Sequence, residues 1–194
     1  MTQRIKSKRS VVSALAFATV LLAGMRVVAQ DKRSTEEYQA QAYGQGTQLG
    51  KNFNVTVIIH EYSAPEDQQI LVKSFEAAGM KGLVNALSKM KAKGHLSITG
   101  TLGYDISYIR SFPTAEGRKI RLVTNRPITF GEAWSDSRSM EYNLSALELN
   151  INEDPKKSAG TLLPACQFQI DKDHELEIVN YQNPWRLTDI LQRK

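Results

Sequence analysis

The sequence predicts an α+β fold, with an antiparallel sheet of about six or seven strands packed with a helical hairpin. Apolar residues alternate at period two through most of residues 95–181, and turn-forming residues break this region into short runs. Residues 63–94 have helical periodicity instead. One alternating run precedes the helical region. The predicted order is therefore strand, helix, helix, strands and a short C-terminal segment.

The first 29 residues have the composition of a signal peptide. Basic residues without an acid precede the apolar run Val11–Ala23, and Val27 and Ala29 suit positions −3 and −1 of a cleavage site. A helix of this run's length rises only ~20 Å, less than the ~30 Å bilayer core, so a membrane anchor is the weaker alternative. We predict cleavage between Ala29 and Gln30, Sec-type export to the periplasm or the medium, and no stable membrane insertion after cleavage.

The positive charge of the chain comes from this leader. The full sequence has 25 basic and 20 acidic residues, a formal charge of +5. Five basic residues precede the predicted cleavage site: Arg4, Lys6, Lys8, Arg9 and Arg26. Without these five, 20 basic residues stand against 20 acidic ones. Because phosphate binding requires an excess of Lys and Arg, we expect no nucleic-acid partner.

Residues 30–51 follow the predicted cleavage site and are rich in Gln, Gly, Ser and Thr. They lack a sustained period, so we predict a flexible N-terminal lead-in, with a short helix around Thr35–Ala42 as the alternative. Alternation begins at Asn52. The apolar positions of this first strand are Phe53, Val55, Val57 and Ile59. The strand opens a single α+β domain, predicted to span residues 52–194.

Two consecutive helical stripes follow the first strand. Ser63 precedes Pro65 and two acids, which together favour a helix start, and Gly79 is a stop signal. The apolar stripes are Ile70, Leu71, Phe75 and Ala78, then Met80, Leu83, Val84, Leu87 and Met90. Three lysines crowd the end of the second stripe: Lys89, Lys91 and Lys93. The pattern predicts a helical hairpin or one kinked helix.

The remaining strands lie in the alternating region 95–181. The apolar runs are Tyr104, Ile106 and Tyr108; Ile120 and Leu122; Cys166, Phe168 and Ile170; Leu176 and Ile178. Within residues 140–151 the apolar phase slips by one, which predicts a β-bulge near Ser145 or Ala146. The segment Pro184–Lys194 is predicted to be extended or a short helix. Three of its side chains are expected to dock on the core: Trp185, Leu187 and Ile190.

The order strand, helix, helix and antiparallel strands is similar to that of helix-grip folds. Those folds hold apolar ligands between a curved sheet and a long C-terminal helix, whereas Pro184–Lys194 has room for only about three turns. The chain also resembles an uncharacterised family of secreted proteins from soil bacteria, in Leu102–Asp105, Gly117–Ile128 and Arg186–Asp189. This resemblance implies an exported domain from about Asn52 to the end, with no established function or catalytic residue.

Metal and cofactor chemistry is not predicted. His60, His95 and His174 are the three histidines, and no pair has the spacing of a metal site. The acidic cluster in residues 171–177 lacks the glycine of a calcium loop and is predicted to be a hairpin turn. Cys166, the single cysteine, is predicted to be a buried, unreactive thiol. We expect no cofactor and no metal.

Candidate functional residues come from the predicted sheet. Asp105 lies beside Tyr104 and near Gly103, which makes it the first candidate for acid–base chemistry, although no catalytic motif surrounds it. Aromatic and arginine side chains on a sheet suit an acidic or sugar ligand, because they stack and donate bidentate hydrogen bonds. The candidate ligand-binding residues are Tyr104, Asp105, Tyr108, Arg118, Arg121, Arg126 and Trp134. A solvated strand face is the alternative for Asp105, and sheet-edge residues that oppose self-association are the alternative for the arginines.

Export and a sizeable core without a catalytic motif favour a non-enzymatic binding or accessory protein, whose partner is an unknown ligand or an envelope protein. One alternative is a periplasmic or extracellular hydrolase that uses carboxylates near Asp105. The other is an envelope assembly module that recruits a second chain along a free strand edge. A concave pocket holding Asp105 with a second acid or a histidine would favour the hydrolase, and a long unpaired edge would favour the assembly module.

Overall fold

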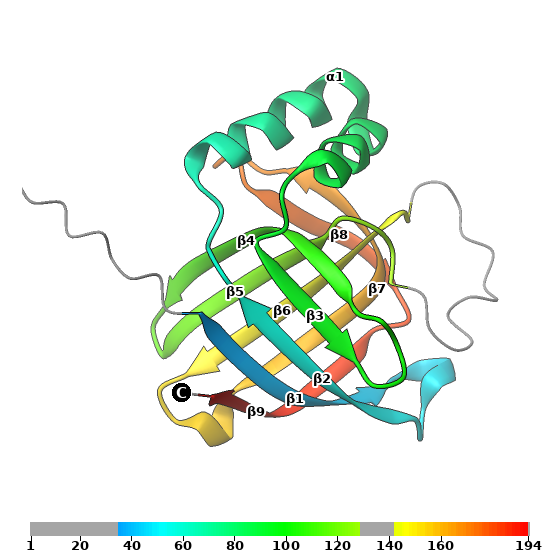
Figure 1. Ribbon diagram of the computed structural model, residues 1–194, viewed down its shortest axis with the longest axis vertical. Helices are drawn as coiled ribbons and strands as arrows, with labels where there is room; N and C mark the ends of the chain where they lie inside the picture. The colour runs from blue at the N-terminus through cyan, green and yellow to red at the C-terminus, as the bar shows by residue number, and fades with distance from the viewer. Residues whose placement is uncertain (1–34, 129–141, 194) are drawn as a thin grey trace, which may run out of the picture. The chain divides into compact units, whose positions relative to one another are not determined.

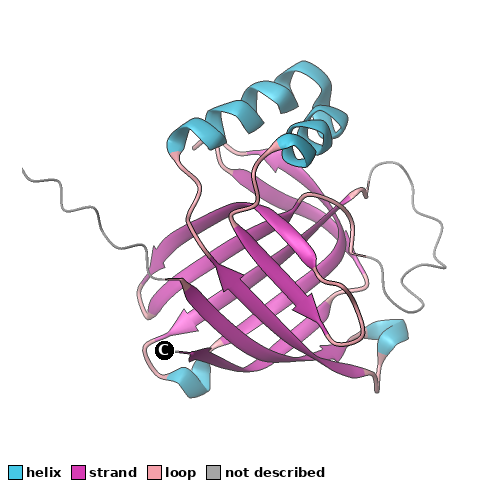
Figure 2. Cartoon of the chain, viewed as in Figure 1, coloured by secondary structure: helices cyan, strands magenta, loops and turns pink. Residues whose placement is uncertain are grey.

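Strands dominate the computed structural model, which describes residues 35–128 and 142–193 (Figures 1 and 2). The strands are β1 (Glu36–Gly44), β2 (Asn52–Ile59), β3 (Gly94–Ile98), β4 (Tyr104–Thr114), β5 (Gly117–Thr124), β6 (Leu144–Asn152), β7 (Ala159–Ile170), β8 (Leu176–Gln182) and β9 (Trp185–Arg193). Within the described residues one long helix, α1 (Pro65–Lys89), separates β2 from β3. Two short 3-10 helices lie in loops of the described part of the chain: η1 (Gly46–Gln48) and η3 (Pro155–Lys157).

Eight of these strands close into an antiparallel barrel. Their order is β6-β5-β4-β3-β2-β1-β9-β7, and pairing of β6 with β7 completes the circle. The ninth strand, β8, pairs with the C-terminal half of β7 outside the circle. The predicted α+β fold, with an open sheet packed with a helical hairpin, is therefore wrong. The prediction lacked β1 and left β9 outside the sheet, and without these two strands the sheet cannot close.

β1 lies in the segment that was predicted to be a flexible lead-in or a short helix. Tyr38 and Ala42 are buried in the barrel interior, with Ala40 packed against them. Only one of these side chains is large, so the alternation gives a weak hydrophobic signal. β2 pairs with one edge of β1 and β9 with the other. The barrel domain therefore includes residues well before Asn52.

The C-terminal segment docks on the core as predicted. Trp185, Leu187 and Ile190 are at most 3% exposed, and the rings of Phe53 and Trp185 pack with centroids 4.6 Å apart. The segment is a strand that bridges β1 and β7. The similarity to helix-grip folds is not borne out, because those folds need a long C-terminal helix and this segment closes a barrel instead.

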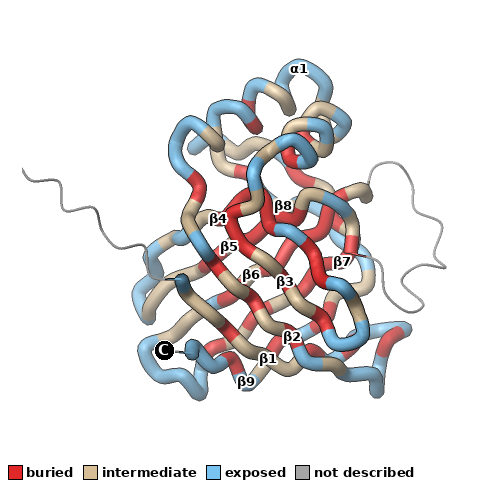
Figure 3. Tube along the Cα trace, in the orientation of Figure 1, coloured by how far each residue is buried: buried red, intermediate tan, exposed pale blue. Residues whose placement is uncertain are grey.

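Two apolar clusters stabilise the domain, and Figure 3 shows the buried positions along the strands and on one side of α1. The first cluster fills the barrel and includes Tyr38, Ile59, Leu96, Ile106, Ile109, Ile120 and Leu122. The second joins α1 to the outer side of the barrel and to β7 and β8; its members include Leu71, Leu83, Leu87, Tyr108, Val123, Cys166, Phe168 and Leu176. Burial of each large apolar side chain contributes about 1.5–3 kcal/mol.

A β-bulge in β4 separates two tyrosines that the alternation placed on one face. The register of β4 against β5 shifts between Ile106 and Tyr108, which leaves Ser107 as the extra residue. Tyr104 and Ile106 therefore point into the barrel, whereas Tyr108 belongs to the outer cluster. Ile109 restores the inward phase.

The irregularity predicted near Ser145 is present but has a different origin. The register of β6 against β7 shifts between Leu144 and Ala146, and the extra residue lies on β7. The apolar phase of β6 changes because both faces of the strand are buried. Leu144 and Ala146 pack in the outer cluster, and Leu147 and Leu149 pack in the barrel.

α1 is one kinked helix, which is one of the two predicted forms. Ala78 (φ −149°) and Gly79 (φ 56°, ψ −143°) interrupt the helical geometry. A side chain at Gly79 would be strained at this positive φ, so glycine suits the kink. The kink divides α1 into a first arm, residues 65–77, and a second arm, residues 80–89.

The start of α1 is fixed by two contacts, one of which corrects the predicted cap. Ser63 does not cap the helix; its Oγ accepts a hydrogen bond from the backbone N–H of Ile109 at 2.9 Å. The Asp67 carboxylate instead accepts the backbone N–H of Ala64 at 2.8 Å. The first arm is thereby attached to β4 at the point where it begins.

Candidate binding groove

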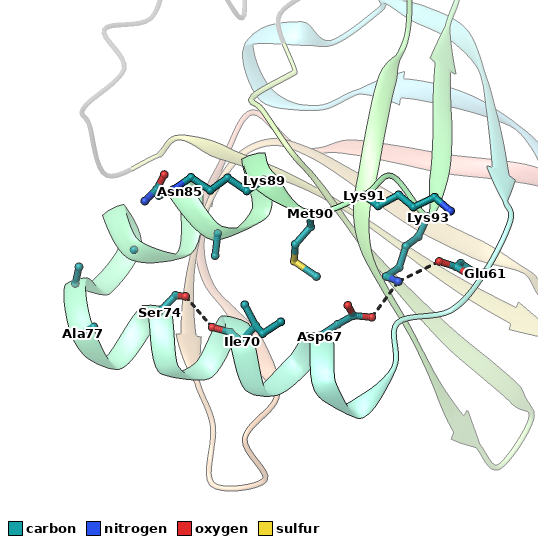
Figure 4. Close-up of a pocket in the computed structure, with 13 residues that line it drawn as sticks. Glu61, Asp67, Ile70, Ser74, Ala77, Asn85, Lys89, Met90, Lys91 and Lys93 are labelled. Carbon is teal, nitrogen blue, oxygen red and sulfur yellow. Dashed lines mark hydrogen bonds and ion pairs between the residues drawn. The ribbon is translucent and has the colours of Figure 1, made fainter.

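The two arms of α1 form the walls of a groove with a volume of about 690 Å³ (Figure 4). The first arm contributes Asp67, Ile70, Ser74 and Ala77, and the second contributes Gly82, Asn85, Ala86 and Lys89. These positions recur three or four residues apart, so each set lies on one face of its arm. The opposite side of α1, with Leu71, Leu83 and Leu87, packs on the outer cluster.

The arms touch each other next to the kink. A Cβ built on Gly82 would lie 1.9 Å from the backbone oxygen of Ser74, so only glycine permits this approach. Ser74 is held in place as well, because its Oγ donates to the carbonyl of Ile70 at 2.7 Å. The groove is consequently narrow at the Ser74–Gly82 contact and extends from there to Asp67 and Met90.

Apolar side chains form the middle of the groove. Ile70 is 51% exposed although it belongs to the stripe that was predicted to face the core. Figure 4 shows Ile70 and Met90 pointing toward each other from opposite walls. Ala77 and Ala86 continue the apolar lining toward the kink. An isolated exposed isoleucine is ordinary on a protein surface, but here it faces a second apolar side chain across a concave site.

A buried lysine closes the end of the groove opposite the kink. Lys93 is only 8% exposed, and its Nζ lies 3.2 Å from a Glu61 oxygen and 3.0 Å from an Asp67 oxygen. Burial lowers the pKa of Lys93, but the hydrogen bonds that its ammonium donates to Asp67 and Glu61 outweigh this effect and raise the pKa above its usual value. The Lys93 ammonium therefore stays charged and offsets one of the two carboxylate charges.

Two further lysines at the same end have no such partner. Lys89 and Lys91 line the groove and are exposed, and neither forms an ion pair or hydrogen bond with a described residue. The lining thus has three lysines and two carboxylates, a formal excess of one positive charge. The groove therefore combines an apolar middle with a positively charged end.

No protein-family model, curated protein or solved structure matches this chain.

The candidate residues predicted from the sequence do not form one site. Arg118 lies at one end of the barrel interior, where it contacts Glu36 at 2.6 Å and Tyr38 at 2.5 Å. Tyr62 also bonds to Arg118 and Glu36, at 3.2 and 3.1 Å. Burial, as the larger cause, and the nearby charge of Glu36, as the next largest, raise the pKa of Tyr62 to about 12. This network leaves its charged groups paired with one another.

Arg121 and Tyr108 lie on the outside of the barrel instead. Arg121 pairs with Glu148 at 2.7 Å and also donates to the carbonyl of Leu176. The Tyr108 hydroxyl donates to Glu175 at 3.3 Å, and Glu175 pairs with Arg110. These contacts attach β8 and the turn before it to the barrel wall. Arg121 and Tyr108 thus have a structural role, which is to hold β8 and the preceding turn against the barrel.

Arg126 and Asp105 belong to neither of these networks. The Arg126 guanidinium lies 4.7 Å from the centre of the Tyr104 ring and donates to the carbonyl of Gly103. The Asp105 side chain is 54% exposed, and His95 Nδ1 lies 3.4 Å from one of its oxygens. Trp134 lies outside the described residues. Among the six candidates that the structure describes, Tyr104 and Arg126 are in direct contact.

The single cysteine and the acidic cluster are where the sequence places them, in a buried strand position and in a turn. Cys166 is fully buried and free, and burial raises the pKa of its thiol, as predicted. Asp171 accepts the backbone N–H groups of Asp173 and Glu175, so the acidic cluster forms the predicted turn between β7 and β8. The described residues contain no group of three or more metal-ligating side chains. Among them, no helix is both long enough and apolar enough to span a membrane.

The groove was missed although its residues were noted in the sequence. The crowding of Lys89, Lys91 and Lys93 predicts a helix end, and the spacing of Ile70 and Met90 places them in stripes that face the core. The sequence does not reveal the direction of the kink. This direction decides which face of each arm is turned toward the other arm. A glycine signals a break in a helix, but its φ and ψ are not readable from the sequence.

Proposed function

We propose that this protein is an exported, non-enzymatic binding protein that holds a ligand in the groove between the two arms of α1. The observation that carries the proposal is the combination of an apolar middle, at Ile70 and Met90, with the unpaired Lys89 and Lys91 at one end. Binding sites are typically concave and mostly apolar, with a few polar groups that orient the ligand. Export rests on the leader sequence, residues 1–29, which lies outside the described residues.

The commitment of the polar groups in the groove supports binding over catalysis. Ser74 donates its hydroxyl hydrogen to a backbone carbonyl, and Glu61 and Asp67 both form ion pairs with Lys93. A nucleophile or general base needs a free lone pair directed at the substrate. These side chains instead hold the walls of the groove in place.

The hydrolase alternative has one feature in its favour. Asp105 has a histidine, His95, within hydrogen-bonding reach. Both side chains, however, are on the outside of the barrel, and neither lines the groove described above. The far nitrogen of His95 lies against the backbone of Gly103, since a Cβ there would come within 2.3 Å of Nε2. The pair therefore lacks a concave surface in which both groups reach one substrate.

The assembly alternative depends on β8, which has one strand neighbour, β7, within the described residues. Its register against β7 shifts opposite Gln167 and Phe168, so Val179 is an extra residue in the strand. Bulges of this kind twist an edge and interrupt its row of hydrogen-bonding groups. Edge pairing by a second chain is thus opposed at the middle of β8, which leaves the groove as the better candidate.

Native mass spectrometry on the protein purified from its own host without denaturant tests the proposal. We expect a bound small molecule that is retained by the wild type and by Lys81→Trp, an exposed substitution outside the groove. We expect Ala86→Trp, which fills the groove, and Ile70→Glu, which places a charge at an exposed apolar position, to lose the molecule. Unchanged retention in both groove variants, or a wild type that carries nothing, would overturn the proposal. The polypeptide mass also tests cleavage after Ala29.

A further inference from the structure

The charge and shape of the groove restrict the class of ligand, an inference that rests on the proposed function. We infer that the occupant is a single-chain amphiphile with a monoanionic head, of the long-chain carboxylate type. Its head would lie at Lys89 and Lys91, and its alkyl chain between Ile70 and Met90 toward the kink.

The charge of the lining specifies the head group. Glu61 and Asp67 are both within 3.2 Å of the buried Lys93, so this trio is fixed and carries one net negative charge before Lys89 and Lys91 are counted. With these two lysines the lining has an excess of one positive charge. A monoanion neutralises that excess. A lysine ammonium is a point charge on a flexible stem, which suits a carboxylate that approaches from solvent.

The narrow end of the groove specifies one alkyl chain. Because Gly82 lies directly against the Ser74 backbone, the arms are in contact there and leave no room for a helix ~10–12 Å across. The stripe from Gly82 to Met90 runs along ~12 Å of helix, and small side chains line its inner half. A tapered apolar slot of this kind accommodates a slender chain rather than a folded peptide or a two-chain lipid.

The outer surface of α1 favours a dissolved ligand over a membrane surface. Outside the groove its exposed charges have both signs, with Glu66 and Glu76 beside Lys73 and Lys81. Binding to an anionic bilayer scales with a cluster of basic residues, which this face does not offer. The ligand is therefore taken up as a monomer from solution.

Titration calorimetry on the protein purified from its own host tests this inference by measuring the affinity for octanoate, decanoate and dodecanoate. Each buried methylene is expected to increase affinity about fourfold until the chain outgrows the groove. Decanol, which has the same chain and no charge, should bind about tenfold more weakly. The double variant Lys89→Gln/Lys91→Gln should lose this tenfold preference for decanoate, whereas Lys73→Gln/Lys81→Gln should keep it.

Two results would overturn the inference. One is equal affinity for decanoate and decanol in the wild type; the other is binding to anionic phosphatidylglycerol vesicles without binding to monomeric decanoate. Failure here is distinguishable from failure of the proposed function. If native mass spectrometry finds a different ligand that Ala86→Trp displaces, the groove is the binding site and only the ligand class is wrong.

Discussion

Arg118 and Glu36 are 82 positions apart in the sequence, and their side chains meet at 2.6 Å across one end of the barrel. Arg118 belongs to β5 and Glu36 to β1, and three strands separate β5 from β1 in either direction around the barrel. The ion pair therefore connects opposite walls. Tyr38 and Tyr62 hydrogen-bond to both partners and complete the network.

Removal of the guanidinium should destabilise the barrel more than its partial exposure suggests. We expect Arg118→Met to lower the free energy of unfolding by about 2 kcal/mol, because it leaves the half-buried Glu36 carboxylate without its cation. Urea unfolding measures the change. Arg186→Met, an exposed arginine on β9, serves as the control and should change stability by less than about 0.5 kcal/mol. An equal loss of unfolding free energy in both variants would show that the cross-barrel pair contributes no more to stability than an exposed arginine does.

The same network predicts a loss of stability in acid. Burial raises the pKa of Glu36, but hydrogen bonds from Tyr38 and Arg118 outweigh it and hold the pKa below its ordinary value of 4.5. A carboxyl whose pKa is depressed by folding contributes stability above its unfolded pKa and loses it as the pH falls through the folded value. We expect Glu36→Gln to flatten the decline of unfolding free energy below about pH 4.5. Glu37→Gln, on the opposite face of β1, should leave the decline unchanged.

The contact between the arms of α1 predicts the effect of one methyl group. In Gly82→Ala the new Cβ would overlap the Ser74 oxygen, so the arms must separate. We expect a loss of about 1–3 kcal/mol in thermal or urea unfolding and a wider groove. Asn85→Ala, an exposed groove residue on the same arm, is the control and should be nearly neutral. Wild-type stability in Gly82→Ala would mean that the arms do not touch as described.

The large apolar side chains were sufficient to locate most strands and the helix, but not their closure into a barrel. Trp185, Leu187 and Ile190 predicted the docking of β9. The sequence does not predict β1 because its inward positions after Tyr38 are alanines and a glycine, which alternate with Gln39, Gln41 and Tyr43. Closure is a property of strand number, tilt and register, and none of these has a local signature in the sequence.

The site was less accessible to sequence reasoning than the fold. Arginines and tyrosines were grouped because they lie on neighbouring predicted strands, but alternation does not say which face is covered from outside. The outer cluster under α1 and β8 buries both faces of several strands, so Arg118 and Arg121 point to opposite sides of the wall and find different partners. The groove depends on one glycine's backbone angles, which composition does not report.

The buried ion trio at the end of the groove gives the last prediction. In Lys93→Met, Glu61 and Asp67 lose the cation that both contact, and two carboxylates then face each other at a partly buried site. We expect a loss of about 3 kcal/mol in the free energy of unfolding, measured in urea near neutral pH. Adding Asp67→Asn should restore part of the lost stability by removing one of the two charges, although Asp67 also holds the start of α1.

The pH dependence of the same trio follows from the pKa of Lys93, which folding raises. The stability that Lys93 contributes is complete below its unfolded pKa and is lost only as the pH rises above 10.5 toward the folded value. A stability difference between wild type and Lys93→Met that shrinks between neutral pH and pH 10 would argue that the trio does not behave as a charged unit.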